Sequence, residues 1–308
     1  MRRLSRRRPR HYTRRVASAV SIVIVAADSG ASLRECVGRA LASSVAVDLV
    51  IVDNGSRDGV PQAIARAYED DDRVRVVYNR ANLGFGPAVN VGARQAHGEA
   101  LLVLNPDCLL EPGTVARLLE VLRAHADAGV VGAVVCSADG TPDPASRRRD
   151  PLLRRALNTV FGRAQREGED AKFAGVNVAG PIPAAAVQVE NVSGALLLLS
   201  HAAFDHLQGF DERYFLHCED LDLCRRARDA GYSVWLAGDV RVTHGKGGSS
   251  RQRPVFVSYH KHRGMWRWFG KFDPAARKPV MRVLVAGGIM AHFALTAPLL
   301  WLRRGHRS

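Results

Sequence analysis

Several common signatures are missing from this chain of 308 residues, and each absence excludes a class of protein. The five cysteines form no CxxC pair, which argues against a disulfide framework and a four-thiolate zinc site and fits a reducing compartment. No GxxxxGK[ST] sequence occurs, and the only GxG, Gly84-Phe85-Gly86, lacks a third glycine. P-loop and dinucleotide-binding sites are therefore poorly supported.

Acidic residues are nearly missing from the two ends of the chain. Residues 1–15 hold eight Arg and no acid, residues 251–282 hold nine Lys or Arg against Asp273, and residues 303–308 hold three Arg. The rest, 16–250, has 24 basic and 29 acidic residues, a net charge of −5 within a whole of +14. The basic character belongs to the ends, so it does not by itself indicate a nucleic-acid-binding body.

Charged residues are missing altogether from residues 283–302, a run that includes His292 and Pro298. About 20 apolar residues suffice to span a bilayer. Basic residues flank the run on both sides, so the positive-inside rule gives it no orientation. A membrane span, a helix lying among the headgroups and a buried terminal helix all remain open.

Alternating apolar runs and helical segments make up the body of the chain. Four β-branched runs are expected to form parallel strands with helices on both faces: Val20–Val25, Leu49–Val52, Val74–Val77 and Leu101–Leu104. Although Arg14, Arg15 and the following apolar residues imitate a signal peptide, we interpret them as a leader and the first of these strands.

The second half of the body is expected to continue this pattern after an interruption. A helix at Thr114–Ala126 and a strand at Val130–Val135 precede residues 137–190, a Pro-, Arg- and Gly-rich insertion or mobile lobe with one helix near Leu152–Phe161. Regular structure resumes with residues 193–200 and a helix at 201–207. Residues 209–244 are expected to hold a loop, a helix and two short strands.

Polar side chains follow the predicted strands, and the carboxyl ends of parallel strands are where open α/β sheets bind ligands. Asp53, in the sequence Asp-Asn-Gly-Ser, could accept hydrogen bonds from a base or ribose, or simply form an Asx turn. Asp107, in Asn105-Pro106-Asp107, suits a divalent cation that bridges two phosphates, or an Asp turn that caps the next helix.

A second group of candidates lies near the end of the body. Glu219 and Asp222 share a helix face and could complement the helix dipole, whereas Asp220 points elsewhere. The aromatic residues before them, Tyr214 and Phe215, could raise the pKa of a carboxylate toward that of a general base. His244 precedes a glycine-rich loop with Lys246, which could contact phosphate; a structural or solvated histidine is the alternative.

Residues 259–269 mix aromatic and basic side chains, a composition that suits either a nucleic-acid surface or a membrane interface.

Taken in order, these elements resemble family 2 glycosyltransferases of the GT-A fold, and in particular the bacterial rhamnosyltransferase-like branch. The resemblance covers about residues 18–265, and its most diagnostic parts are NPD (105–107) and GFDERYF followed by EDLDL. The full series is SIVIV (21–25), VDNGS (52–56), NLGFGPAVNVGARQAHG (82–98), LLVLNPD (101–107), GALLLLSHAAFDHLQGFDERYF (194–215), EDLDLCRRARDAGY (219–232) and VTHGKGGSS (242–250).

The resemblance assigns a role to each candidate. It implies an α/β GT-A fold, Rossmann-like and mostly parallel with helices on both faces, followed by a C-terminal apolar helix. It makes Asp220 the catalytic base, and Asp107 and His244 the ligands of Mg²⁺ or Mn²⁺ on the donor diphosphate. Residues expected to bind the nucleotide sugar are Asp28, Asp53, Asn82, Asn90, Asn105 and Lys246. Those expected around the acceptor are Glu219, Asp211 and Tyr214.

Two departures from the family pattern refine these expectations. Many relatives have TYN where this chain has Ala26-Ala27-Asp28, so Asp28 is expected to contact the nucleotide differently. Processive relatives carry QxxRW, whereas Gly264 replaces the Gln before Arg267-Trp268. One sugar transferred per encounter is therefore expected rather than polymerisation.

The domain boundaries follow from the same resemblance. We expect a basic, disordered leader at 1–17 and a catalytic domain at 18–265, followed by a basic and apolar membrane-associating tail at 266–308. Within the catalytic domain, residues 18–136 form the nucleotide-sugar half, 137–190 a variable loop region and 191–265 the acceptor half.

The predicted function is inverting, metal-dependent, non-processive transfer of a sugar, with dTDP-L-rhamnose as the first candidate donor. The acceptor is a hydroxyl of a lipid-linked or cell-envelope saccharide at the cytoplasmic face of the bacterial inner membrane, where the basic ends would contact anionic lipid. No nucleic acid is expected as a partner. The alternatives are a nucleotidyltransferase-like enzyme and a basic non-enzyme that binds nucleic acid or membrane.

Overall fold

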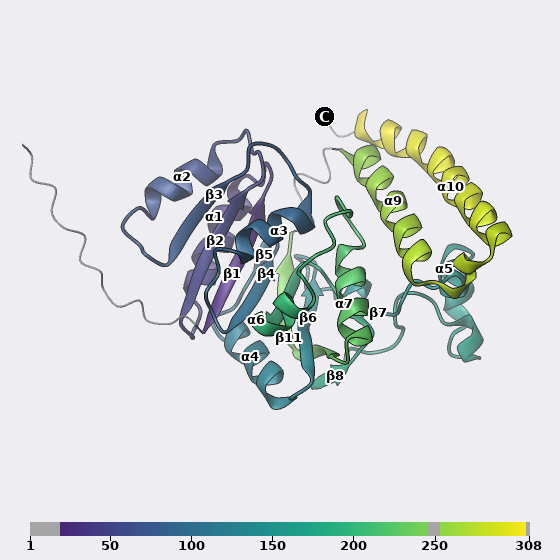
Figure 1. Cartoon of the computed structure of the whole chain (residues 1–308), viewed down its shortest axis with the longest axis horizontal. Coiled ribbons are helices and arrows are strands. Elements are labelled where there is room, and N and C mark those ends of the chain that lie inside the picture. Colours follow the sequence, from purple (N-terminus) through teal and green to yellow (C-terminus); the bar gives the residue numbers. More distant parts are fainter. Residues whose placement is uncertain (1–18, 246–252, 306–308) are drawn as a thin grey trace, which may run out of the picture.

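A nine-stranded sheet forms the centre of the protein, whose computed structural model describes residues 19–245 and 253–305 (Figure 1). The strand order is β3-β2-β1-β4-β10-β6-β11-β5, and β8 pairs with β11. The strands are β1 Val20–Ala26, β2 Val47–Asp53, β3 Val74–Tyr78, β4 Ala100–Leu104, β5 Cys108–Leu109, β6 Ala128–Cys136, β8 Ala186–Gln188, β10 Leu196–Ser200 and β11 Ser233–His244.

The four β-branched runs form the parallel strands that the sequence predicts. β1 pairs in parallel with β2 and β4, and β2 with β3. Every residue of β1 and β4 is buried, which explains why these strands are apolar on both faces rather than alternating. The exception is Ser21 of β1, whose hydroxyl donates to Asp48 at 2.8 Å. Strand β10 runs antiparallel between β4 and β6, so the far part of the sheet is mixed.

Helices cover both faces of this sheet, as predicted. One core packs α1 (Ala31–Leu41), α2 (Val60–Ala67) and α4 (Thr114–Ala124) against one face. The other core packs α3 (Phe85–Ala93), α6 (His201–His206) and α7 (Glu219–Asp229) against the opposite face. The carboxyl ends of β1, β2 and β4 are thereby left at one sheet edge.

The structure differs from two local expectations. The helix predicted over Thr114–Ala126 ends at Ala124, because His125 takes an extended conformation with φ −124°. Residues 233–244 form one strand, β11, instead of two short strands, with an irregular pairing to β6 between Ala237 and Arg241.

The insertion at 137–190 contains several short elements and pairs with the segment that leads back into the sheet. Its β7 (Arg147–Arg148) pairs antiparallel with β9 (Asn191–Val192), directly before β10. Its single α-helix is α5, Leu153–Val160, close to the predicted Leu152–Phe161. Three 3-10 turns complete the segment: η1 Pro144–Ser146, η2 Arg163–Arg166 and η3 Ala171–Phe173.

Two long helices follow the sheet and lie side by side at the right of Figure 1: α9 (Pro254–Phe272) and α10 (Pro279–Gly305), joined by the turn η4 (Pro274–Arg277). Residues Pro279–Trp301 form a stretch long and apolar enough to span a membrane, with a mean hydropathy of 1.9, and none of its apolar part is buried. The alternative of a buried terminal helix is therefore wrong. The leader at 1–17 lies outside the described residues.

Candidate active site

Two loops that follow β1 and β2 are joined at the sheet edge. Asp53 accepts hydrogen bonds from the Ser56 N–H (2.8 Å) and from Gln62 Nε2 (3.0 Å). The Ser56 hydroxyl in turn accepts the Asp28 N–H at 3.2 Å, and Asp28 Oδ1 accepts the Arg57 N–H at 2.6 Å. The structure thus brings Asp28 and Asp53 to one loop cluster; contact of either with a nucleotide stays a prediction.

Asn54 holds this loop cluster together, a role that sequence reasoning did not assign to it. Its Nδ2 donates to Asn82 Oδ1 and to the Gly84 carbonyl, both at 3.0 Å. Its Oδ1 accepts from Asn79 Nδ2 at 3.1 Å and from the Leu83 N–H at 3.0 Å. The side chain is only 2% exposed, so it fixes the loop after β3 rather than contacting solvent. Its place between Asp53 and Gly55 in the turn was the available signal.

The two predicted asparagines of this region have different surroundings. Asn82 lies beside Asn54, where its Oδ1 also accepts the Gly84 N–H at 2.9 Å. Asn90, on α3, uses its amide to bind both backbone groups of Phe210 and the carboxylate of Glu212. Asn90 therefore anchors the 209–215 loop to α3, and its contact with a nucleotide remains untested.

The predicted metal ligands come together at the end of β4. The short strand β5 pairs antiparallel with the last residues of β11, which places His244 opposite Cys108 and next to Asp107. His244 Nε2 lies 3.0 Å from Asp107 Oδ1 and 3.2 Å from Asn105 Nδ2, and the Gly245 N–H donates to the Asp107 carbonyl. Lys246 falls outside the described residues.

The chemistry of this donor set fits a divalent cation that also contacts substrate. Two donors that occupy adjacent positions of an octahedral ion, at bond lengths of about 2.1 Å, lie about 3 Å apart, as Oδ1 and Nε2 do here. In the described part of the chain no group of three or more His, Cys, Asp and Glu side chains converges on one point. An ion here would thus take the rest of its ligands from diphosphate and water, as Mg²⁺ usually does.

Asp220, at the start of α7, is almost buried and fully hydrogen-bonded. Its Oδ2 accepts the Gly194 N–H at 2.9 Å and an ion-pair hydrogen bond from Arg148 of β7, and its Oδ1 accepts the Leu221 N–H at 2.8 Å. Burial alone would raise the pKa of Asp220, but the Arg148 guanidinium and the N–H donors outweigh it and hold this pKa below its ordinary value. Asp220 is therefore ionised at neutral pH.

The neighbouring Glu219 is shifted in the opposite direction. Burial, followed by the negative charge of Asp220, raises the pKa of Glu219 well above its ordinary value, and its Oε2 is buried without a hydrogen-bond partner. Adjacent carboxyl groups whose pKa values are driven apart are typical of sites with separate proton-accepting and proton-donating groups. Of the carboxylates after Tyr214 and Phe215, Glu219 has the raised pKa and Asp220 does not, and the causes at Glu219 are burial and the charge of Asp220.

His217, a partly buried residue whose Nε2 atom is fully buried, is a further group that sequence reasoning missed. Burial, and after it the charge of Lys261, lowers the pKa of His217 from 6.5 to about 4, and its Nε2 has no hydrogen-bond partner. His217 and Cys218 both have a φ of +68°, a left-handed conformation that is uncommon outside glycine and recurs at functional sites. Its position two residues before Glu219 was the only sequence signal.

Side chains of helix α9 contact two further predicted residues, Asp211 and Tyr214. Asp211 Oδ2 accepts hydrogen bonds from Arg267 (2.7 Å) and Lys271 (3.1 Å). Burial alone would raise the pKa of Asp211, but hydrogen bonds from Arg213, Arg267 and Lys271 hold it well below its ordinary range. Tyr214 is buried under the Arg267 guanidinium, 5.2 Å from its ring centre. Both residues brace the loop before α7.

The two-residue segment Gly194-Ala195 is hydrogen-bonded both to Asp220 of α7 and to Asn105 at the end of β4. The Gly194 N–H donates to Asp220, and the carbonyl of the next residue, Ala195, accepts the Asn105 N–H at 2.9 Å. A Cβ on Gly194 would lie 3.1 Å from both Cβ and Oδ2 of Asp220, so this close approach favours glycine. The carboxylate of Asp220 and the backbone of Asn105, two residues before Asp107, are therefore held by neighbouring residues of one segment.

Comparison with known proteins shows the family to which this chain belongs. The model of glycosyl transferase family 2 matches residues 21–179. The chain is 30% identical over 261 residues to the N-acetylglucosaminyl-diphospho-decaprenol L-rhamnosyltransferase of Mycobacterium tuberculosis, covering 74% of this chain and 79% of that protein. It is 22% identical to a low-salt glycan biosynthesis hexosyltransferase of Haloferax volcanii, covering 73% of this chain and 66% of that protein.

Solved structures share the fold at low sequence identity. A mannosyltransferase from Pyrobaculum calidifontis, in complex with GDP-Man and Mn²⁺, matches with a TM-score of 0.57 at 17% identity, covering 93% of this chain and 74% of that one. GalNAc-T7 with UDP, GalNAc and Mn²⁺ matches with a TM-score of 0.56 at 14% identity, covering 80% and 48%. The predicted GT-A-like architecture is confirmed.

Proposed function

Because this chain belongs to glycosyl transferase family 2 and is a glycosyltransferase, we propose that it transfers one L-rhamnosyl unit from dTDP-L-rhamnose to a lipid-linked saccharide. The observation that carries the proposal is the Gly194-Ala195 segment, which holds Asp220 and Asn105 on one support. A sugar transferase that works by direct displacement needs a base and a diphosphate-binding group on opposite sides of the reacting sugar.

The proposed reaction is a single displacement. Asp220 accepts the proton of the acceptor hydroxyl while the hydroxyl oxygen forms a bond to the anomeric carbon. The bond from that carbon to the diphosphate oxygen breaks on the opposite face, and the diphosphate leaves with the electron pair. Attack and departure on opposite faces invert the anomeric configuration. Arg148 keeps Asp220 ionised and positioned for this proton transfer.

Charge that grows on the leaving diphosphate needs compensation at the end of β4. Asp107 and His244 would hold a divalent cation, Mg²⁺ or Mn²⁺, whose bound form supplies positive charge to the diphosphate. Mn²⁺ in two structures of similar fold supports this assignment. On the donor side, Asp28, Asp53 and Asn82 form the polar loop cluster proposed for the nucleotide.

The acceptor and its location are proposed from the relatives and from α10. The similar mycobacterial protein is named for a diphospho-decaprenol acceptor, and such an acceptor is held in a membrane. The exposed apolar helix α10 gives this chain a matching surface. We place the enzyme at the cytoplasmic face of the bacterial inner membrane, adding one sugar per encounter.

A donor screen combined with product analysis tests the proposal. The full-length protein with Mn²⁺ is titrated with dTDP-rhamnose, UDP-sugars and GDP-sugars in thermal unfolding, since a ligand of the native state raises stability by mass action. We expect the largest shift with dTDP-rhamnose and an anomerically inverted product on a lipid-linked N-acetylglucosamine acceptor. A product that retains the donor's anomeric configuration would refute the single displacement, and a preferred UDP- or GDP-sugar would replace the donor.

The family assignment also bears on the alternatives raised by the sequence. It favours sugar transfer over nucleotidyl transfer and over a non-enzymatic nucleic-acid-binding role. In a separate assay with a nucleoside triphosphate and a sugar phosphate, formation of a nucleotide sugar with release of free diphosphate would instead support the nucleotidyltransferase.

A further inference from the structure

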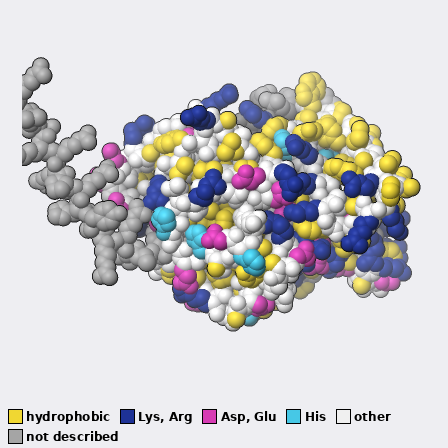
Figure 2. Space-filling model, in the orientation of Figure 1, with side chains coloured by type: hydrophobic (Ala, Val, Ile, Leu, Met, Phe, Trp, Pro, Cys, Tyr) yellow, Lys and Arg dark blue, Asp and Glu magenta, His cyan; other side chains and the backbone are white. Residues whose placement is uncertain are grey.

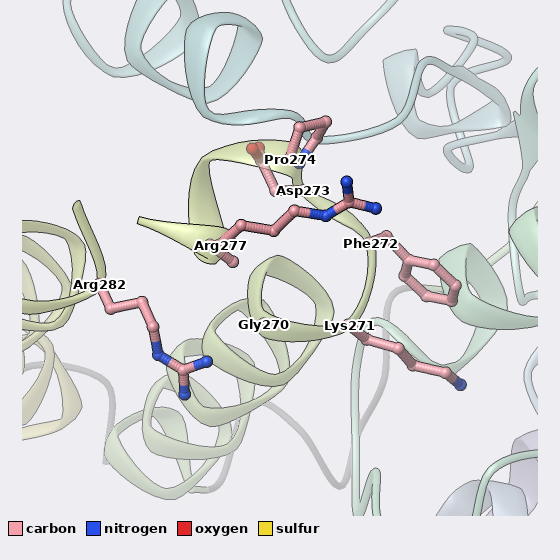
Figure 3. A pocket seen from close by; sticks show the side chains of 8 residues that line it. Gly270, Lys271, Phe272, Asp273, Pro274, Arg277 and Arg282 are labelled. Atoms are coloured by element: carbon pink, nitrogen blue, oxygen red, sulfur yellow. The ribbon is translucent and has the colours of Figure 1, made fainter. Parts of the chain in front are cut away.

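The turn between α9 and α10 forms an open pocket whose lining residues include none of those proposed for the active site. Its volume is about 370 Å³. Arg277 and Arg282 both line it, and Figure 3 shows their side chains extending in different directions. The remaining lining residues are Lys271, Phe272, Asp273, Pro274 and Ala276. We call this pocket the elbow.

The elbow carries positive charge that the described part of the chain leaves uncompensated. Neither Arg277 nor Arg282 has an ion-pair partner among the described residues; Arg282 instead lies over the Trp266 ring at 5.7 Å. Lys271 points away from Arg282 and is occupied by Asp211 and Asp222.

The only carboxylate among the residues that line the elbow, that of Asp273, accepts hydrogen bonds from backbone N–H groups. Asp273 Oδ1 accepts the Ala275 N–H at 2.8 Å, and its Oδ2 accepts the Leu153 N–H at 2.6 Å. The two arginines therefore line a pocket whose one acidic side chain, Asp273, is already hydrogen-bonded to the backbone.

The start of α10 adds to this positive potential. A helix N-terminus bears a partial positive charge, and acidic side chains normally compensate it. The first turn of α10 has no acidic residue, and Lys278 and Arg282 lie at the same end. The helix begins at Pro279, next to the lining residue Arg277. An anion in the elbow would lie at this helix end, and the exposed guanidinium groups of Arg277 and Arg282, which point in different directions in Figure 3, would turn toward it.

An apolar surface runs along α10 from this pocket. Val280, Val283, Leu284, Met290 and Leu295 are each 61–73% exposed. Figure 2 shows hydrophobic side chains gathered over the helix at the upper right, with Lys and Arg side chains below them. An exposed apolar face bordered by cations is typical of helices that lie in the headgroup region of an anionic membrane.

The opposite face of α10 is covered by α9. This packing favours an α10 that lies on the membrane over one that crosses it. His262 Nε2 lies 2.8 Å from His292 Nδ1, and the rings of Tyr259 and Phe293 are 6.1 Å apart. Helix α9 carries Lys261 and Arg263 at exposed positions beside this contact. If α10 crossed the bilayer in this packing, it would take those charges into the hydrocarbon, at high energetic cost.

We propose that the elbow binds the phosphate of an anionic phospholipid headgroup while α10 lies in the plane of the membrane, exposed face down. The inference rests on the proposed function only in placing the enzyme at a membrane. Arg277 and Arg282 hold the headgroup, and the apolar face enters the acyl boundary. Because α9 ties α10 to the loop before α7, the bound lipid fixes how the active site faces the membrane.

The first test measures binding of the full-length protein to vesicles of phosphatidylcholine with and without phosphatidylglycerol. We expect the double variant Arg277→Gln/Arg282→Gln to lower the partition coefficient on the anionic vesicles about thirtyfold, the ratio for two cationic contacts at an anionic surface. The control Arg34→Gln/Arg66→Gln removes the same charge from exposed sites on α1 and α2. An equal loss from both pairs, or no loss from the elbow pair, would overturn the elbow site.

The second test measures how deeply two positions of α10 lie in the membrane. All five native cysteines are buried, so single cysteines at Val280 and Met290 can be labelled selectively with a fluorophore. In-plane binding predicts equal quenching depth for the two labels. A spanning helix would separate them by about 15 Å in depth, at 1.5 Å per residue, and that outcome would refute the in-plane orientation.

Rhamnosyl transfer to a soluble acceptor, measured on the same variants, separates this inference from the proposed function. Unchanged transfer with weakened vesicle binding supports the elbow. Unchanged vesicle binding in a protein that transfers rhamnose leaves the function standing and rejects the elbow, whereas intact lipid binding without any transfer rejects the function alone.

Discussion

At the scale of single residues, the adjacent carboxyl groups of Glu219 and Asp220 are driven to different protonation states by their partners. Asp220 has Arg148 and two N–H donors, while Glu219 is buried beside a negative charge with one oxygen unpartnered. Sequence spacing places both on the first turn of a helix, but it says nothing of Arg148, which lies 72 residues earlier in the chain.

The exchange Asp220→Asn is expected to lower kcat by about 10²–10⁴, the usual contribution of a positioned base, and to leave donor binding unchanged. It also leaves the buried Arg148 unpaired, so the variant should lose about 3–5 kcal/mol of stability. Steady-state kinetics and denaturant unfolding measure the two effects.

A matched double variant separates these effects. Adding Arg148→Gln to Asp220→Asn removes the unpaired charge, so stability should largely return while kcat stays low. Recovery of kcat together with stability would show that Asp220 acts only through the fold.

His217 predicts a pH dependence of stability. Its pKa is lowered by burial from 6.5 to about 4, so the unfolded chain binds a proton that the folded chain does not between these values. The contribution of neutral His217 to the free energy of unfolding is complete above pH 6.5. It is lost as the pH falls toward 4, and the free energy of unfolding then decreases by about 3 kcal/mol at most.

His217→Asn removes this titration while keeping a residue that tolerates a positive φ. Urea unfolding between pH 7 and pH 4 should give a smaller loss of stability for the variant than for the wild type. Parallel curves for the two proteins would contradict the assignment.

At the scale of elements, the candidate metal ligands depend on a two-residue strand. β5 holds the end of β11 so that His244 meets Asp107 across 137 residues of sequence. Each ligand stood out in the sequence, Asp107 in Asn105-Pro106-Asp107 and His244 before a glycine-rich loop, but only the family order suggested that they meet.

Replacing Asp107 by Asn or His244 by Ala should weaken Mn²⁺ binding in the presence of nucleoside diphosphate by at least about a hundredfold, since even outer-shell partners cost up to that much. Electron paramagnetic resonance of free Mn²⁺ measures the affinity without any need for turnover. Asp239→Asn, a carboxylate on the same strand that pairs with Arg117 at the surface, is the control. Equal affinity in all three variants would exclude this pair as the metal site.

Three of the parallel strands were predicted to within one residue at each end, whether or not both of their faces are buried. β1 and β4 are almost entirely apolar because helices cover each side, whereas β3 is only partly buried and was placed as closely. β11 was divided in two because Gly238 and Asp239 interrupt its apolar pattern, although the strand continues there with an irregular pairing. β7 carries only Arg147 and Arg148, so no pattern marks it as a strand.

At the scale of the whole molecule, the separation of charge found in the sequence corresponds to a separation in space. The body, of net charge −5, holds the carboxylates of the proposed site. The described part of the basic C-terminal segment forms α9, the elbow and the start of α10. Sequence alone could not decide between a crossing and a surface helix, because that depends on which face of α10 is covered by α9.

This arrangement predicts that the apolar face of α10 serves the acceptor and not the chemistry. Leu284→Asp/Leu295→Asp places two charges on exposed positions, so the fold should be unaffected. We expect KM for a lipid-linked acceptor in vesicles to rise at least about tenfold, because burying a charged side chain in apolar surroundings is costly. Transfer to a soluble acceptor should keep its kcat and KM, and Leu284→Met/Leu295→Met should behave as wild type with both acceptors. If the aspartate variant lost activity equally on the two acceptors, α10 would be supporting the catalytic body through α9 rather than meeting the membrane.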